Sequence, residues 1–226
     1  MFPKWANKNQ TSFYYTSMSS GLPAIYEYSL SSGTKNHIVS GEGMLVCSDV
    51  SLDVNKLLLT MSPDGQPDIY EFDNTTKSST KLTDFSGIDV SGHYLLGGKD
   101  IVFVSNRLGY PNIFKKYIDS STVSQIVFRG IENNSCDTKG EKIVYSSRES
   151  KNIFGSNTFN IYMISGGNTF PLTSSGENQF PRFSDDGNVV MYIRQSSGNS
   201  YAGFVNPRTN QNKLFEINSK VQSIDW

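Results

Sequence analysis

One segment of this chain occurs five times, and that repetition limits the possible folds more than any other feature. The clearest copy covers residues 57–82, where an apolar run is followed by the turn Ser62-Pro63-Asp64-Gly65 and an alternating run from Ile69 to Asp73. A polar turn and a short run, Thr80-Lys81-Leu82, complete the copy. Short apolar runs between Pro, Gly, Asn and Asp are typical of strands and turns rather than helices.

The Ile-Tyr pair at the centre of the segment sets the period. Its copies are Ile25-Tyr26, Ile69-Tyr70, Ile113-Phe114, Ile161-Tyr162 and a degraded Gly203-Phe204, with second residues 44, 44, 48 and 42 positions apart. An apolar strand precedes each pair, at residues 13–17, 58–62, 101–105, 143–147 and 189–193. A short closing strand follows, at 38–39, 81–82, 125–126, 171–172 and 213–214. A repeat of about 40–45 residues with four short strands predicts a β-propeller blade.

We name the four strands of each repeat A to D and expect A to be innermost. Its expected markers are Trp5, Val50, Tyr94, Cys136 and Phe183. The A–B turn is clearest at residues 183–187, where Asp and Gly favour a tight hairpin. It is reduced to Asp53-Val54-Asn55 and Thr138-Lys139-Gly140 in two other repeats, whereas residues 62–65 follow strand B and predict a B–C turn. The predicted blades are residues 1–44, 45–88, 89–132, 133–178 and 179–221.

The last five residues, 222–226, match the first inner strand, because Trp226 corresponds to Trp5. We therefore expect a single all-β domain with five complete repeats and one orphan inner strand. This pattern predicts a six-bladed ring that lacks most of one blade at its N-terminus. The alternative is a five-bladed ring in which residues 222–226 pack as an extra strand. An unpaired strand edge would favour association with another chain.

The composition excludes several classes of function. The 226 residues carry a net charge of −1 with no basic stripe, so we expect no nucleic-acid partner. The longest apolar runs are far shorter than the roughly 18–20 residues that span a bilayer, so we expect no membrane insertion. We see no signal peptide.

The reactive residues form no catalytic or metal-binding pattern. Cys47 and Cys136 begin non-adjacent repeats, so we expect two free, buried thiols. His37 and His93 have no acidic or cysteine neighbour at ligand spacing, which argues against a metal site. Ser200 lies in a near match to a nucleophile elbow, but we expect it in a B–C hairpin, and both histidines precede it. We expect no cofactor; calcium in the channel is the open alternative.

Several motifs resemble the Asp-rich propeller repeats of the TolB family, the periplasmic component of the Tol–Pal envelope system of Gram-negative bacteria. The motifs are residues 67–70, 81–83, 105–114, 171–173 and 180–187, of which the string from Ser105 to Phe114 is the most specific. The resemblance covers the whole chain. The family also has an N-terminal domain and a first blade, and we expect both to be missing from this sequence.

The resemblance implies a non-enzymatic periplasmic scaffold for outer-membrane integrity and cell division. Such propellers bind the peptidoglycan-associated lipoprotein Pal on the face built by D–A and B–C loops, and the absent N-terminal region communicates with TolA. Arg107 and Tyr110 rank first, because Arg and Tyr are common interface anchors. The loop at residues 41–44 departs from better-known members. The residues implied as partner-binding are Glu42, Met44, Asp84, Phe85, Arg107, Tyr110, Glu132, Asn133, Arg148, Glu177 and Asn178.

Two other functions stay open. Similar repeats form the gating propeller of serine peptidases of the prolyl-oligopeptidase type. A ligand-binding or lyase propeller would need a cluster of charged inner-strand residues at the channel, and we identify none in the sequence. For Asp68, Asn112 and Asn160, which precede the central strands, we expect hydrogen bonds to backbone donors at the blade edge.

Overall fold

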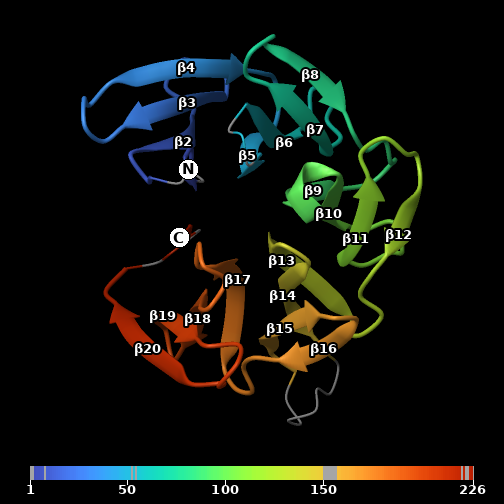
Figure 1. The fold of residues 1–226 in the computed structure, drawn as a ribbon, viewed down its shortest axis with the longest axis vertical. Coiled ribbons are helices and arrows are strands. Elements are labelled where there is room, and N and C mark those ends of the chain that lie inside the picture. Colours follow the sequence, from blue (N-terminus) through green and yellow to red (C-terminus); the bar gives the residue numbers. More distant parts are fainter. Residues whose placement is uncertain are drawn as a thin grey trace.

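The fold is a β-propeller built from five four-stranded sheets (Figure 1). The computed structural model describes residues 3–7, 9–51, 53, 55–149, 157–219, 221 and 224–225. Within each sheet the strands are antiparallel and paired in chain order, and the first strand of each sheet lies nearest the central axis (Figure 1). The prediction of an all-β propeller with inner strand A is confirmed.

Each repeat forms one blade. The first blade contains β1 (Lys4–Trp5), β2 (Ser12–Ser17), β3 (Ala24–Ser29) and β4 (Lys35–Ser40). The second contains β5 (Leu45–Val50), β6 (Lys56–Met61), β7 (Asp68–Asp73) and β8 (Ser78–Lys81). The third contains β9 (Asp89–Leu95), the short helix η1 (Leu96–Gly98), β10 (Asp100–Ser105), β11 (Asn112–Tyr117) and β12 (Val123–Gln125). The fourth contains β13 (Glu132–Lys139), β14 (Lys142–Arg148), β15 (Phe159–Ser165) and β16 (Asn168–Pro171). The fifth contains β17 (Glu177–Phe183), β18 (Val190–Ser196), β19 (Asn199–Val205) and β20 (Asn212–Ile217).

The core is divided into four apolar clusters, each between two successive blades. Strand β6 shows how the alternation works: Leu57 and Leu59 pack toward the first blade, whereas Leu58 packs toward the third. Because successive side chains of a strand point to opposite faces, one strand can contribute to two clusters. Each fully buried leucine contributes about 1.5–3 kcal/mol. The blades are therefore held together mainly by sheet-on-sheet packing.

The ring has five blades and not the six that we predicted. Each of the five repeats supplies one sheet, and the described residues leave no strands for another. Of the predicted orphan strand, residues 222, 223 and 226 lie outside the described residues, and Ile224 and Asp225 are not in a strand. Both chain ends lie between the first and fifth blades (Figure 1). No apolar cluster among the described residues joins these two blades.

Two predicted registers were wrong by one or two residues. In β13 the residue equivalent to Tyr94 is Thr138 and not Cys136. Tyr94 pairs with Ile101 and Thr138 pairs with Ile143, and each of these isoleucines is the first core residue of its strand. In the fifth blade the Ile-Tyr pair corresponds to Ala202-Gly203, because Gly203 pairs with Tyr192.

The fifth blade has glycine at this place because the Tyr192 ring fills the space: a Cβ on Gly203 would lie 2.2 Å from that ring. A one-residue slip sends every side chain of a strand to the other face. Phe204 consequently lies on the face turned away from the fourth blade.

The remaining predictions for the turns and thiols hold. The A–B turn at residues 183–187 is closed by hydrogen bonds from Ser184 N to Val189 O and from Gly187 N to Ser184 O. Residues 62–65 form the B–C turn between β6 and β7. Cys47 and Cys136 are free and buried.

Glu132 and Glu177, which we assigned to the ends of the third and fourth blades, begin the inner strands of the next blades. Val54 lies outside the described residues.

Gly43 gives a direct test of the D–A loop conformation. Its φ is +67°, and a Cβ there would lie 2.3 Å from Ser62 O, whereas Gly65 has φ +89° with open space around it. We predict that Gly65→Ala costs about 1–2 kcal/mol, the strain of a left-handed residue. Gly43→Ala should cost clearly more, because the backbone of residue 62 must also move. Urea denaturation measures both variants; equal losses would contradict the close approach.

Candidate functional site

The D–A and B–C loops meet at one end of the propeller, and we call this surface the loop face. It comprises residues 18–23, 41–44, 62–67, 82–88, 106–111, 126–131, 172–176 and 197–198. Neighbouring loops are joined by backbone hydrogen bonds, from Asp89 N to Pro67 O at 2.9 Å and from Asn133 N to Pro111 O at 2.8 Å. These bonds fix the loops to the blades beneath them.

Polar residues at the start of strand C hold this end of the blades together. Asp68 Oδ1 accepts from Thr83 Oγ1 at 2.9 Å and from Phe85 N at 3.4 Å. Asn112 Oδ1 accepts from Ile113 N at 2.8 Å. The predicted bonds to backbone donors are confirmed for Asp68 and Asn112. Asn160 Oδ1 instead accepts from side chains, those of Thr173 and Asn178.

Arg107 is held by the propeller itself. Its Nη2 lies 2.9 Å and 3.2 Å from the two carboxylate oxygens of Asp89, which is fully buried. Its guanidinium lies 5.1 Å from the Phe85 ring centre and 4.9 Å from that of Phe114. With 19% of its side chain exposed, Arg107 supports the loop face rather than projecting from it. Tyr110, by contrast, is 69% exposed.

Three other predicted site residues form a bridge between the fourth and fifth blades. Arg148 Nη2 lies 3.3 Å from Glu177 Oε1, and Arg148 Nε lies 3.8 Å from Glu132 Oε2. Asn133 and Asn178 are fully buried, so they present no surface to a partner.

The remaining predicted site residues are spread over the loop face. Glu42 and Met44 are exposed, and Phe85 is half-buried beneath Arg107. Asp84 is exposed and pairs with Lys81 at 2.6 Å. The structure thus brings Arg148 together with Glu132 and Glu177, and Arg107 together with Phe85, but it does not gather the predicted residues into one cluster.

Exposed apolar side chains are the feature of the loop face that the sequence reasoning mostly missed. Phe128, in the loop between the third and fourth blades, is 79% exposed. Contiguous exposed apolar surface often marks an interaction site. An apolar residue in a D–A or B–C loop would have identified these positions, because the alternation of buried and exposed residues in strands does not account for apolar residues in loops. The exposed apolar residues of this face are Met18, Leu22, Met44, Ile88, Leu108, Tyr110, Phe128 and Ile131.

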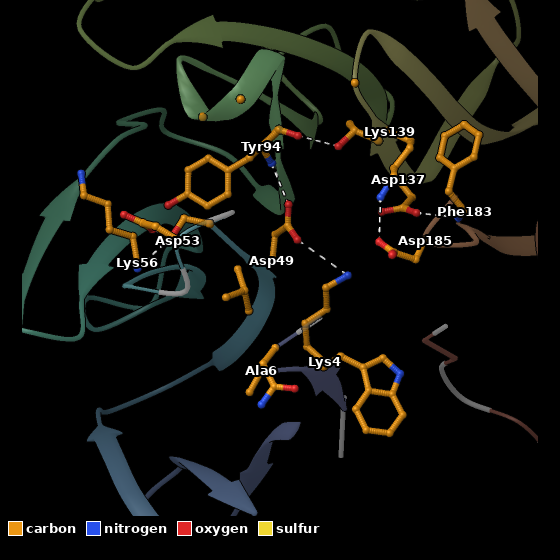
Figure 2. A pocket seen from close by; sticks show the side chains of 18 of the residues that line it. Lys4, Ala6, Asp49, Asp53, Lys56, Tyr94, Asp137, Lys139, Phe183 and Asp185 are labelled. Atoms are coloured by element: carbon orange, nitrogen blue, oxygen red, sulfur yellow. Dashed lines mark hydrogen bonds and ion pairs between the residues drawn. The ribbon is translucent and has the colours of Figure 1, made fainter. Parts of the chain in front are cut away.

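A second polar feature lies on the axis. One residue of each inner strand, and one of the C-terminal segment, belong to it, and we call these six residues the axial ring. Four inner-strand pairs contain a β-bulge, which changes the direction of the following side chain. The ring residues Lys4, Asp49, Asp137 and Asp225 also line the cavity of about 940 Å³ shown in Figure 2. The six ring residues are Lys4, Asp49, His93, Asp137, Arg182 and Asp225.

The carboxylates of the axial ring connect successive blades. Asp49 Oδ2 accepts from Tyr94 N at 2.9 Å, and Asp137 Oδ2 accepts from Phe183 N at 2.8 Å (Figure 2). Positive groups alternate with these carboxylates: Lys4 Nζ lies 3.7 Å from Asp49 Oδ1. Burial lowers the pKa of Lys4, but the neighbouring carboxylates outweigh burial and raise it above its ordinary value.

The axial ring corrects our expectation that the inner strands lack a charged cluster. Its charges are satisfied mainly by one another, which favours a structural role. His93 is buried, and its Nδ1 lies 3.4 Å from Asp137 Oδ1 and 3.8 Å from Asp49 Oδ2. Neither ring nitrogen has a hydrogen-bond partner within the described part of the chain. Burial, followed by the positive charges of Arg182 and Lys4, holds the pKa of His93 well below its ordinary value of 6.5.

The described residues give no support for metal or serine chemistry. No group of three or more His, Cys, Asp or Glu side chains within them could hold a metal ion. Ser200 lies inside β19 and not in the hairpin where we expected it; it is 4% exposed and shares hydrogen bonds with Gln195. The described segments also include no helix with the length and hydropathy to cross a bilayer.

The fold and its polar networks define a β-propeller whose loop face exposes several apolar side chains. Over residues 1–226 the sequence matches the family described as TolB beta propeller domain. The chain therefore belongs to the TolB β-propeller family.

Relatives and solved structures agree with this assignment. The chain is 47% identical to the Tol-Pal system protein TolB of Wolinella succinogenes, over 100% of this chain and 54% of the relative. It is 43% identical to the TolB of Helicobacter pylori strain J99, over 100% and 55%. The crystal structure of TolB from Acinetobacter baumannii superposes with a TM-score of 0.84 at 27% identity, covering 96% of this chain and 54% of that one. The chain thus spans about half the length of these relatives.

A more distant structure shares the fold alone. It is the β-propeller domain of the Trilobed protease from Pyrococcus furiosus, described as having an open velcro topology. The TM-score is 0.66 at 12% identity, covering 96% of this chain and 69% of that one.

The depressed pKa of His93 predicts how stability depends on pH. Because the folded protein favours neutral His93, this contribution is complete above pH 6.5 and is lost as the pH falls below that value. We expect the contribution of His93 to the free energy of unfolding to fall between pH 7.5 and 5.5, with a slope approaching about 1.4 kcal/mol per pH unit.

His93→Gln should remove this slope, whereas His37→Gln, at an exposed histidine, should keep it. Urea denaturation at a series of pH values measures the slope. The same slope in the His93→Gln variant and the unmodified chain would contradict the assignment.

Proposed function

We propose that this chain is the partner-binding propeller of a Tol–Pal system and that it binds the lipoprotein Pal on its loop face. It acts in the periplasm as a non-enzymatic scaffold that supports outer-membrane integrity and cell division. Family membership and the similarity to TolB relatives support this proposal. Because the chain spans about half of those relatives, the proposal concerns the propeller only.

The observation that carries the proposal is the exposed apolar surface of the loop face. Tyr110 and Phe128 are its most exposed aromatic residues, and they belong to the B–C loop of the third blade and the following D–A loop. Aromatic side chains provide large contact areas at small entropic cost, and they are frequent hot spots of interfaces. Both side chains therefore serve as the central contacts with Pal.

The charged residues of the loop face have a different role in this proposal. Arg107 and Arg148 are occupied by buried or bridging carboxylates, so they hold the loops in place. Glu42 and Asp84, which are exposed, lie at the rim of the contact. Rim charges affect association rate and specificity more than affinity.

The test is a calorimetric titration with the soluble domain of Pal from the same organism. We expect one-to-one binding, and we expect Tyr110→Ala and Phe128→Ala each to weaken it about tenfold or more. Both residues are exposed, so the variants should keep the stability of the unmodified chain within about 0.5 kcal/mol.

The matched control is Tyr117→Ala. Tyr117 is 54% exposed, but it lies at the C–D end, opposite the loop face. This variant should bind Pal like the unmodified chain. No binding by the folded chain would refute the proposal, and equal weakening by Tyr117→Ala would refute the placement of the site.

A further inference from the structure

Two exposed apolar residues of the loop face are each held by the first residue of a B–C loop. Met44 and Ile88 directly precede the inner strands β5 and β9, and they are 46% and 47% exposed. Ser62 and Asn106 directly follow β6 and β10, the second strands of the same two blades. We call Ser62 and Asn106 the clasp residues.

Each clasp residue makes two hydrogen bonds to the apolar residue beside it. Asn106 Oδ1 accepts from Ile88 N at 2.8 Å, and Asn106 N donates to Ile88 O at 3.2 Å. In the second blade, Ser62 Oγ accepts from Met44 N at 2.6 Å, and Ser62 N donates to Met44 O at 3.1 Å. Two different residue types thus make the same pair of bonds in successive blades.

In the third blade the clasp residue also closes the B–C turn. Asn106 O accepts from Gly109 N at 2.8 Å. The loop that contains this turn carries Leu108 and Tyr110, which are 61% and 69% exposed. Asn106 therefore fixes Ile88 of the D–A loop to the B–C loop that carries the other two apolar side chains.

A glycine before each apolar residue lets the two loops approach closely. A Cβ on Gly87 would lie 2.4 Å from Asn106 Oδ1, and a Cβ on Gly43 would lie 2.6 Å from Ser62 Oγ. Side-chain carbons do not come this close to other atoms. Gly87 has no positive φ, so the close approach of the clasp residue, and not the backbone conformation, accounts for glycine there.

We infer that Asn106 and Ser62 are positioning residues of the proposed Pal site, and that they hold Ile88 and Met44 in place for contact with Pal. The inference rests on the proposed function, since it concerns the same surface. Binding a partner has an entropic cost when loops and side chains must become ordered, and a loop already fixed by the fold avoids part of that cost. The clasp residues thus increase the affinity through the D–A loops.

The first test is a calorimetric titration with the soluble domain of Pal, on variants whose fold is confirmed by circular dichroism. Asn106→Ala removes the acceptor of the Ile88 amide and should weaken binding about threefold to tenfold. Asn106→Ser copies the second blade, so its hydroxyl provides an acceptor and it should bind Pal like the unmodified chain.

The matched control is Asn206→Ala. Asn206 Oδ1 also accepts from a backbone amide, that of Arg208 at 2.9 Å, but in the C–D turn between β19 and β20, at the end opposite the loop face. This variant should leave Pal binding unchanged. Equal weakening by Asn206→Ala and Asn106→Ala would overturn the inference, because the effect would then not depend on the clasp.

Hydrogen exchange of the unbound chain, followed by NMR, measures the clasp itself. The Ile88 amide should exchange about tenfold faster in Asn106→Ala than in the unmodified chain, because its acceptor is lost. Asn106→Ser should restore the slow exchange. An unchanged exchange rate in Asn106→Ala would overturn the inference, since the side chain of Asn106 would then not hold the D–A loop.

A double-mutant cycle separates positioning from direct contact with Pal. Ile88→Ala should weaken binding, and the addition of Asn106→Ala should weaken it little further, because Asn106 acts through Ile88. Additive losses would overturn the inference. Unchanged binding by Asn106→Ala would overturn it too, and would leave the proposed function intact. No Pal binding by the unmodified chain would refute the proposed function and the inference together.

Gly87→Ala is a second variant, and it carries the test if Asn106→Ala does not fold by circular dichroism. Its added Cβ forces the D–A loop away from Asn106. It should therefore speed the exchange of the Ile88 amide and weaken Pal binding. Normal exchange and normal binding in folded Gly87→Ala would overturn the inference.

Discussion

The packing of each blade's face against the next blade is the interaction on which the rest of this structure depends. Four apolar clusters provide it, and each draws on both neighbouring sheets. Such an array is quasi-one-dimensional, because each unit contacts only its neighbours. Within the described residues, the first and the fifth blade each have one face that belongs to none of these clusters. On the first blade this face carries Trp5, Phe13, Tyr15, Tyr26 and Tyr28, whose rings contact one another.

The axial ring adds directional links to this non-directional packing. Burying an ion is costly unless it is paired and hydrogen-bonded, and the ring meets both conditions by alternating carboxylates with Lys4 and Arg182. His93 is the member without a hydrogen bond in the described residues, and it remains neutral. The axial ring thus has a structural role, whereas the loop face exposes apolar side chains.

The repeat predicted the blades, their strands and most of their turns, because alternating apolar residues and Asp-Gly turns are compatible with few other folds. The axial ring escaped prediction because its members differ in chemistry: Lys4, Asp49 and His93 share a position but no residue type. The pairing of Arg107 with Asp89 was not predicted, because the two residues are distant in sequence. The exposed Phe128 was overlooked because an apolar loop residue adjacent to buried Val127 is easily assigned to the core.

The central claim is that the loop face, held by inter-blade packing, is where a partner binds. Hydrogen–deuterium exchange of the chain with and without Pal tests it most directly. We predict slower exchange in residues 82–88, 106–111 and 126–131, with no change in the A–B turns at residues 139–142 and 184–189. Slower exchange in those A–B turns, with the loop face unchanged, would contradict the account and place the partner at the opposite end of the propeller.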